Sequence, residues 1–319
     1  MFKVHVESIL QKDYSATTGI AFCDRVIAGV GVTDQEEGGP RTADMSEQQE
    51  IIIRPGMGAI HYWRDLWRYR ELFFFLAWRD ILVRYKQTVI GIAWSVIRPL
   101  ATMLVFTVVF GKLAKFPSNG VPYPVMVYAA MLPWQFFANA LTESSNSLTD
   151  NANLLSKVYF PRLIVPASAV IVSLVDFLIS SVILAGVMAW YRFVPDMKIL
   201  LLPAFLLMAF LASFGAGLWF SALNVKYRDF RYVVPFLVQF GLYISPVGFS
   251  SAIVPEQWRF LYFLNPMVGV IDGFRWATLG DAFPVNWSGF MVSASLVVLI
   301  FVGGVLYFRS MERSFADVV

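Results

Sequence analysis

Several residue types and motifs are scarce in this chain of 319 residues, and each scarcity excludes a class of protein. A single cysteine, Cys23, rules out an internal disulfide and a cysteine-based metal cluster, and there are only two histidines. We therefore expect no metal site. Charged residues make up only 15% of the chain, and a net charge of +3 without a basic block gives no reason to expect a nucleic-acid partner.

Motifs of common catalytic sites are missing as well. The sequence has no GxxxxGK[ST] loop that could hold nucleotide phosphates, and neither GxSxG nor HExxH occurs. We therefore expect that the chain is not an enzyme and has no cofactor of its own. If it carries out active transport, an ion gradient or a separate subunit must supply the energy.

Apolar residues are in excess. They make up 58% of the chain, aromatic residues alone make up 16%, and the mean hydropathy is +0.63. This is more apolar surface than one folded core can hide, so membrane lipid must cover the rest. The sequence therefore predicts an all-α integral membrane protein.

Six segments approach the length of about 20 apolar residues that crosses a bilayer core. They are residues 89–110, 124–141, 163–190, 199–223, 232–249 and 289–308. Residues 250–284 are apolar but repeatedly broken by proline and glycine, which predicts two short re-entrant helices between spans 5 and 6. Residues 61–78 alternate aromatic and basic residues and predict an amphipathic helix in the membrane interface.

Residues 1–55 are predicted to be a poorly ordered cytoplasmic extension without a signal peptide, and residues 56–319 to be the transmembrane domain. With both termini inside, thirteen Lys and Arg residues lie on the cytoplasmic side of this domain and six on the outer side. This bias predicts a multi-pass protein of the inner (plasma) membrane with cytoplasmic N- and C-termini.

Two ionisable residues lie clearly inside the predicted spans, Arg98 in the first and Asp176 in the third. They could pair with each other, or Arg98 could extend to the membrane surface while Asp176 takes a backbone or hydroxyl partner. Two charges make a poor proton relay. We therefore expect them to have a structural role or to line a conduit.

Aromatic residues recur within the predicted spans, notably Trp94 in the first and Phe236, Phe240 and Tyr243 in the fifth. Phe236 and Phe240 are four residues apart and so share one helix face. Aromatic rings stack on the apolar faces of sugar rings, which favours a sugar conduit. Lipid contact and core packing remain the alternative for any one of these residues.

Two predicted cytoplasmic loops are short and basic, residues 151–162 and 224–231, and either could bind a partner protein or simply follow the positive-inside rule.

Four stretches now show a family resemblance: RYKQTVIGIAWSVIRPL (84–100), LLSKVYFPRLIVP (154–166), NVKYRDFRYVVPF (224–236) and LNPMVGVIDGFRWATLG (264–280). In this order they resemble ABC-2-type permeases that export polysaccharides, most closely the O-antigen lipopolysaccharide permeases. The resemblance covers roughly residues 60–319.

The resemblance implies a homodimer bound to two nucleotide-binding ATPase subunits, which hold ATP and Mg, and an undecaprenyl-linked polysaccharide as cargo. It implies a conduit lined by Trp94, Arg98, Phe236, Phe240 and Tyr243, and a periplasmic gate with Trp258, Phe260, Tyr262 and Phe263. It also implies ATPase coupling through Leu154, Lys157, Tyr159, Phe160, Arg162, Tyr227, Arg228 and Asp229. A capsule or teichoic-acid permease and, less favoured, an ion-coupled secondary transporter are the alternatives.

Overall fold

The computed structural model of the protein describes residue 64 and residues 66–86, 89–157 and 160–312, apart from the side chains of residues 89–95. Within these ranges the regular secondary structure is helical, without a strand, as predicted. The expected N-terminal extension, residues 1–55, lies outside them. In chain order the elements are α4 (Arg70–Lys86), α5 (Val89–Phe106), η1 (Thr107–Leu113), α6 (Tyr123–Asp150), α7 (Ala152–Leu155), α8 (Ile164–Trp190), η2 (Met197–Leu201), α9 (Leu202–Lys226), α10 (Phe230–Ile244), η3 (Ser251–Ile253), α11 (Glu256–Tyr262), α12 (Pro266–Leu279), η4 (Gly280–Ala282) and α13 (Trp287–Met311).

Four helical stretches among the described residues are long and apolar enough to cross a membrane. They are Val96–Leu113, Ile164–Trp190, Met197–Lys226 and Trp287–Met311. α10 is apolar but has only 15 residues. The membrane-protein prediction is thus supported, whereas the count of six spans stays a prediction.

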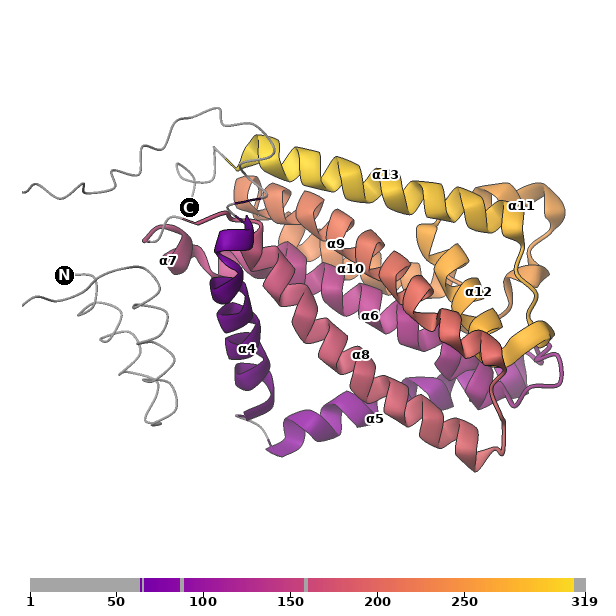
Figure 1. Cartoon of the computed structure of the whole chain (residues 1–319). Helices are drawn as coiled ribbons and strands as arrows, with labels where there is room; N and C mark the ends of the chain where they lie inside the picture. Colours follow the sequence, from indigo (N-terminus) through magenta and orange to yellow (C-terminus); the bar gives the residue numbers. More distant parts are fainter. Residues whose placement is uncertain (1–63, 65, 87–88, 158–159, 313–319) are drawn as a thin grey trace, which may run out of the picture. The chain divides into compact units, whose positions relative to one another are not determined.

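The long helices form a bundle in which α6 packs on α8 and α9, and α9 packs on α13 (Figure 1). α4 crosses one end of this bundle and contacts α8. The predicted interfacial helix, residues 61–78, overlaps the first part of α4, and its place in the membrane interface stays a prediction. We call this the α7 end, because α7 lies there, and the opposite end, which holds α11 and α12, the α11 end (Figure 1).

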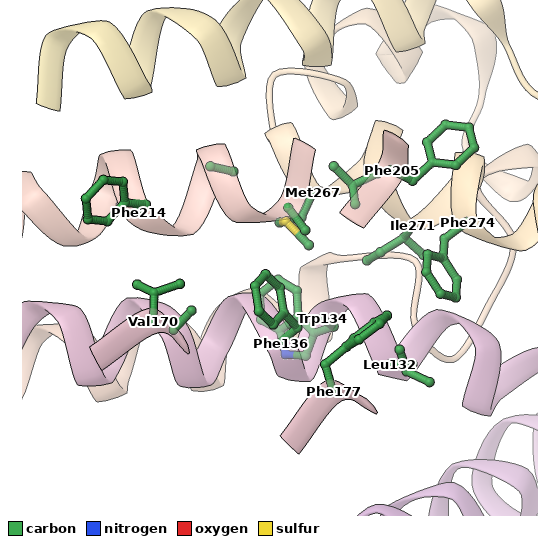
Figure 2. Close-up of a cluster of buried hydrophobic side chains, with 14 of the residues drawn as sticks. Leu132, Trp134, Phe136, Val170, Phe177, Phe205, Phe214, Met267, Ile271 and Phe274 are labelled. Carbon is green, nitrogen blue, oxygen red and sulfur yellow. The ribbon is translucent and has the colours of Figure 1, made fainter. Parts of the chain in front are cut away.

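The core of the bundle is built from large apolar side chains of α6, α8, α9 and α12 (Figure 2). Phe177 of α8 lies edge-on between Phe136 of α6, at 5.7 Å between ring centroids, and Phe274 of α12, at 6.1 Å. Such edge-to-face pairs are a favourable arrangement of aromatic rings. The short helix α12 is therefore an integral part of the bundle core.

α6 runs well past the expected end of the second span at residue 141, to Asp150. Its last turns are rich in hydroxyl residues, which normally compete with helix formation. Here their side chains donate to carbonyl oxygens three or four residues earlier in the same helix, from Thr142 to Ala138 at 2.8 Å and from Ser147 to Ser144 at 2.8 Å. Most of these hydroxyl side chains are thus satisfied locally, and the helix continues.

α9 and α13 approach so closely at Gly215 and Gly304 that a Cβ on Gly304 would collide with the carbonyl group of Gly215 and come within 2.8 Å of Trp219. A Cβ on Gly215 would collide with the backbone of Phe301. Only glycine allows backbones to come this close, the arrangement by which small residues bring membrane helices together.

Candidate functional site

α10 carries the largest part of the predicted conduit and leaves most of its surface uncovered. Among its 15 residues only Val234 is buried. Phe236 and Phe240 are 64% and 55% exposed, and their rings stack with centroids 6.0 Å apart and planes 5° apart. Tyr243, one turn further on, is also exposed. The spacing of three and four residues places the three rings in a row along one helix face.

Close packing of the opposite face of α10 explains why the aromatic row points outward. A Cβ on Gly241 would come within 2.7 Å of the Trp134 ring of α6, so the glycine lets α10 lie directly against that ring. Val234, 1% exposed, fills the same side about two turns earlier. The aromatic residues occupy the remaining side.

The other two predicted conduit residues lie on α5. The side chain of Trp94 is outside the described residues. Arg98 is exposed, and its carbonyl oxygen accepts a hydrogen bond from Thr102 at 2.9 Å. α5 and η1 also present exposed aliphatic side chains, namely Ile97, Leu104, Val105, Val108 and Val109.

The four predicted gate residues at the α11 end do not share one environment. Trp258 and Phe260 of α11 are exposed. Tyr262 donates a hydrogen bond to the carbonyl oxygen of Ile244 at 2.9 Å, at the end of α10. Phe263 is buried against Gly289 of α13, where a Cβ would overlap its ring.

The first predicted coupling loop is partly folded into the protein. Lys157 is exposed and Leu154 packs against the core, while Tyr159 lies outside the described residues. Phe160 is only 4% exposed and belongs to the core, so its ring is not presented to a partner here. Arg162 holds the end of α13, because its backbone N–H donates to Glu312 Oε1 at 2.9 Å and its guanidinium to the Glu312 carbonyl oxygen at 3.1 Å.

The second predicted coupling loop, which joins α9 to α10, is open to its surroundings. Tyr227, Arg228 and Asp229 are all exposed. Just before them, the buried side chain of Asn224 donates to the carbonyl oxygen of Ser145 at 2.8 Å. The end of α9 is thus fastened to α6, the helix that leads into the first loop.

Asp176 is the centre of a polar cluster between α4, α6 and α8, and Arg98 is not among its contacts. Arg84 of α4 pairs with Asp176 Oδ2 at 2.8 Å and reaches Glu143 of α6 at 3.2 Å, and the Tyr85 hydroxyl donates to Asp176 Oδ1. Burial, followed by the hydrogen bond to Asp176, raises the pKa of Tyr85 well above its ordinary value, so the hydroxyl keeps the proton that it donates. The suggested pairing of Arg98 with Asp176 was wrong, because α4 lies against α8 and supplies a nearer cation.

The sequence reasoning missed Arg84, Tyr85 and Asn224 as contacts between helices. Each is a polar residue at the end of a largely apolar helix, which is a sign of a polar partner but does not identify it. Within the described part of the chain, no group of three or more His, Cys, Asp or Glu residues is placed to hold a metal ion.

Comparison with known proteins gives a consistent result. The sequence model of the ABC-2 type transporter family matches residues 71–279. The O-antigen export system permease protein RfbA of Myxococcus xanthus is 27% identical over 256 residues, covering 80% of this chain and 97% of the relative. The protein of the same name from Klebsiella pneumoniae is 25% identical over 242 residues, covering 76% and 92%. Polysialic acid transport protein KpsM of Escherichia coli is 25% identical over 244 residues, covering 74% and 92%.

Proposed function

We propose that this chain, which belongs to the ABC-2 type transporter family, is the channel-forming permease subunit of an ABC exporter for a lipid-linked polysaccharide of the O-antigen type. The names of its relatives, which are permeases for O-antigen and a transport protein for polysialic acid, support a polysaccharide cargo. An undecaprenyl carrier is the lipid that we propose for it. The cargo moves from the cytoplasm to the periplasm.

The observation that carries this proposal is the uncovered row of Phe236, Phe240 and Tyr243 on α10. Sugar rings offer apolar C–H faces that stack on such rings, and a hydroxyl such as that of Tyr243 offers a hydrogen bond. Stacking of this kind is weak and repeated, so a chain can bind and still move on, as conduction requires.

We propose that two copies of the chain enclose the conduit, each contributing its α10 and α5 faces. α10 has a single buried residue and α5 presents several exposed aliphatic side chains, so both helices have surface left for a second copy and for cargo. In a single chain, lipid would have to cover this surface.

For the topology we propose six spans, formed by α5 with η1, α6, α8, α9, α10 and α13. α11 and α12 then re-enter the membrane from the periplasmic side, which is supported by the complete burial of Met267 and Val268 near the start of α12. Non-helical backbone at membrane depth is tolerated where protein buries it. An even number of spans places both termini on the same side, and the bias of Lys and Arg makes that side the cytoplasm, which the α7 end then faces.

Because the sequence has no phosphate-binding loop, we propose that two copies of a separate subunit bind ATP and Mg and drive transport. Exposed Lys157, Tyr227 and Arg228 at the α7 end are suited to contact this partner. Through Asn224, a push on the second loop would also reach α6.

The test is glycan export by cells that carry Phe240→Ala and Tyr243→Ala, alone and together. We expect surface glycan to fall in each single variant and further in the double variant, at unchanged protein level. Trp190→Ala is the matched control, since Trp190 is 84% exposed at the end of α8 and outside the proposed conduit. Normal surface glycan in the double variant would contradict a conduit along α10.

An ion-coupled transporter is disfavoured by the surroundings of Asp176, whose carboxylate pairs with Arg84 and accepts a hydrogen bond from Tyr85. The chain alone in vesicles, with an ion gradient and no ATPase subunit, should move no cargo. Accumulation under those conditions would replace the proposal with the ion-coupled one. Transport assays that offer the complex a capsule polysaccharide and an O-antigen in turn would show which of the two cargo types it exports.

A further inference from the structure

The chain that follows α10 is held far more firmly than α10 itself. α10 ends at Ile244, and Ser245 takes an extended conformation with ψ of 151°, as expected for a residue before a proline. Residues 245–248 and Ser250 are buried, although the helix before them is almost entirely uncovered. Something must therefore fix this segment at the α11 end.

Arg275 of α12 is the main contact. Its side chain is 1% exposed, and its two terminal nitrogens donate to the carbonyl oxygens of Phe249 at 2.6 Å and Val247 at 2.9 Å. A planar guanidinium with forked donors is suited to bridging two carbonyl groups at once, which a lysine cannot reproduce. α12 in turn belongs to the core of the bundle.

Three further side chains hold the same segment. The Tyr123 hydroxyl donates to the carbonyl oxygen of Gly248 at 2.5 Å, the Tyr262 hydroxyl to that of Ile244 at 2.9 Å, and the Asn265 amide to the Ser245 hydroxyl at 3.0 Å. We call Tyr123, Tyr262, Asn265 and Arg275 the clamp. Its members come from α6, α11, the start of α12 and α12 itself, so the segment is tied to several parts of the bundle.

The other end of α10 has no comparable attachment among the described residues. Arg231 lies 3.7 Å from Asp150, and both side chains are more than half exposed. Exposed ion pairs of this kind contribute little to stability. The Phe230 ring contacts Phe220 and Tyr227 with centroids more than 6 Å apart. One end of the helix is thus bound tightly and the other loosely.

We infer that the clamp is the fulcrum on which α10 turns, and that Arg275 is its main positioning residue. The α11 end of α10 stays in place, while the α7 end, next to the loop of residues 224–231, swings. The inference rests on the proposed function and deepens it: if α10 turns about the clamp, the conduit widens first at the α7 end, where the ATPase subunit acts. It also makes a prediction about the free chain that does not depend on transport.

The size of the motion scales with the helix length and the tilt angle. At 1.5 Å per residue, 15 residues span about 22 Å, so a tilt of about 10° about one end moves the other end by about 4 Å. A displacement of this size is measurable as a distance between two spin labels.

The experiment uses the full chain in lipid nanodiscs, with Cys23→Ser to remove the native thiol. One labelled pair, at Tyr232 and Leu306, reports the α7 end, and another, at Ile244 and Met291, reports the α11 end. All four positions are exposed. Doubly labelled chains are diluted with unlabelled chains, so that only distances within one chain are read.

Without nucleotide, we expect a wider distance distribution for the α7-end pair than for the α11-end pair. In Arg275→Met the α11-end distribution should broaden to match it, and in Tyr262→Phe, which removes one bond of the clamp, it should broaden less. Arg259→Met is the matched control, because Arg259 lies on α11 and contacts Glu256 and Val254 but not residues 244–250. It should change neither distribution. Equal widths in the wild type, or unchanged α11-end widths in both clamp variants, would overturn the fulcrum.

With the ATPase subunit and ATP, the α7-end distance should shift, by about 4 Å for a tilt of about 10°, and the α11-end distance should stay constant. A shift of both pairs, or of the α11-end pair alone, would overturn the fulcrum. If the complex exports glycan while neither pair shifts, the fulcrum is also wrong. If ATP has no effect on transport, the proposed function fails, and the nucleotide-free comparison still decides on the clamp.

Discussion

Asparagine in place of Asp176 should loosen α4 from the bundle. Arg84 and Asp176 are 2.8 Å apart, with side chains 34% and 11% exposed, so the pair is neither buried completely nor free in solvent. Asparagine keeps the shape and still accepts a hydrogen bond from Tyr85, but it removes the charge that Arg84 faces.

The expected loss can be bounded from both sides. Breaking a buried ion pair costs about 3–5 kcal/mol, whereas a fully exposed ion pair contributes about 0–1 kcal/mol. The low exposure of Asp176 favours the first range and the partial exposure of Arg84 favours the second, so the pair lies between them. We therefore expect about 2 kcal/mol, which corresponds to roughly a thirtyfold larger population of released α4.

Amide hydrogen exchange in nanodiscs measures this population directly, because exchange in α4 tracks its local opening. Protection of the α4 amides should fall by about thirtyfold in Asp176→Asn, and protection in α13 should not change. Asp150→Asn is the control, since Asp150 pairs only loosely with Arg231 at 3.7 Å. A cycle with Arg84→Met isolates the pair itself. A coupling energy below about 0.5 kcal/mol would refute the reasoning.

Three other outcomes follow from the structure. Gly304→Leu should destabilise the protein by about 3 kcal/mol, the upper range for overpacking, because the added side chain meets backbone. Gly186→Leu on α8 is the control, since a side chain there has open space and should cost little stability. Equal thermal midpoints of the two variants in detergent would contradict this. The hydrogen bond from Lys198 at 2.6 Å lowers the pKa of Asp281. The stabilisation of the fold by this ion pair is therefore fully present above the ordinary aspartate pKa of about 3.9, and it is lost only as the pH falls below that value. The difference in thermal midpoint between wild type and Asp281→Asn should accordingly stay constant from pH 8 to about pH 5, and a loss near pH 6 would be inconsistent with the ion pair. A reporter enzyme fused after Val319 should be active in the cytoplasm, and activity in the periplasm would reverse the proposed topology.

The apolar character of the long helices could be predicted from the sequence because it depends on composition over whole segments. The predicted third span, residues 163–190, differs from α8 by one residue at its start. The end of the fifth span was placed five residues too late, at 249, although Ser245 and Pro246 mark where the helix stops. The extension of α6 to Asp150 was missed because bonds from hydroxyls to the helix backbone cannot be seen in a hydropathy profile.

The partners of individual side chains could not be predicted. Nothing in the sequence near Asp176 indicates Arg84, which is 92 positions away and arrives only because α4 crosses α8. Arg275 is one of the six basic residues that were counted on the outer side of the membrane, but it lies buried against backbone carbonyls. Phe160 appeared suited to a partner's groove because of its loop, and it is instead part of the core.

The contact between Gly215 and Gly304 has a further consequence for the surrounding bilayer. Acyl chains cannot wedge between two helices whose backbones touch, so the seam between α9 and α13 is closed to lipid. Lipid-soluble probes and detergents should therefore enter the protein elsewhere. This pair of helices forms a sealed wall, and a sideways passage for a lipid tail would have to run between other helices.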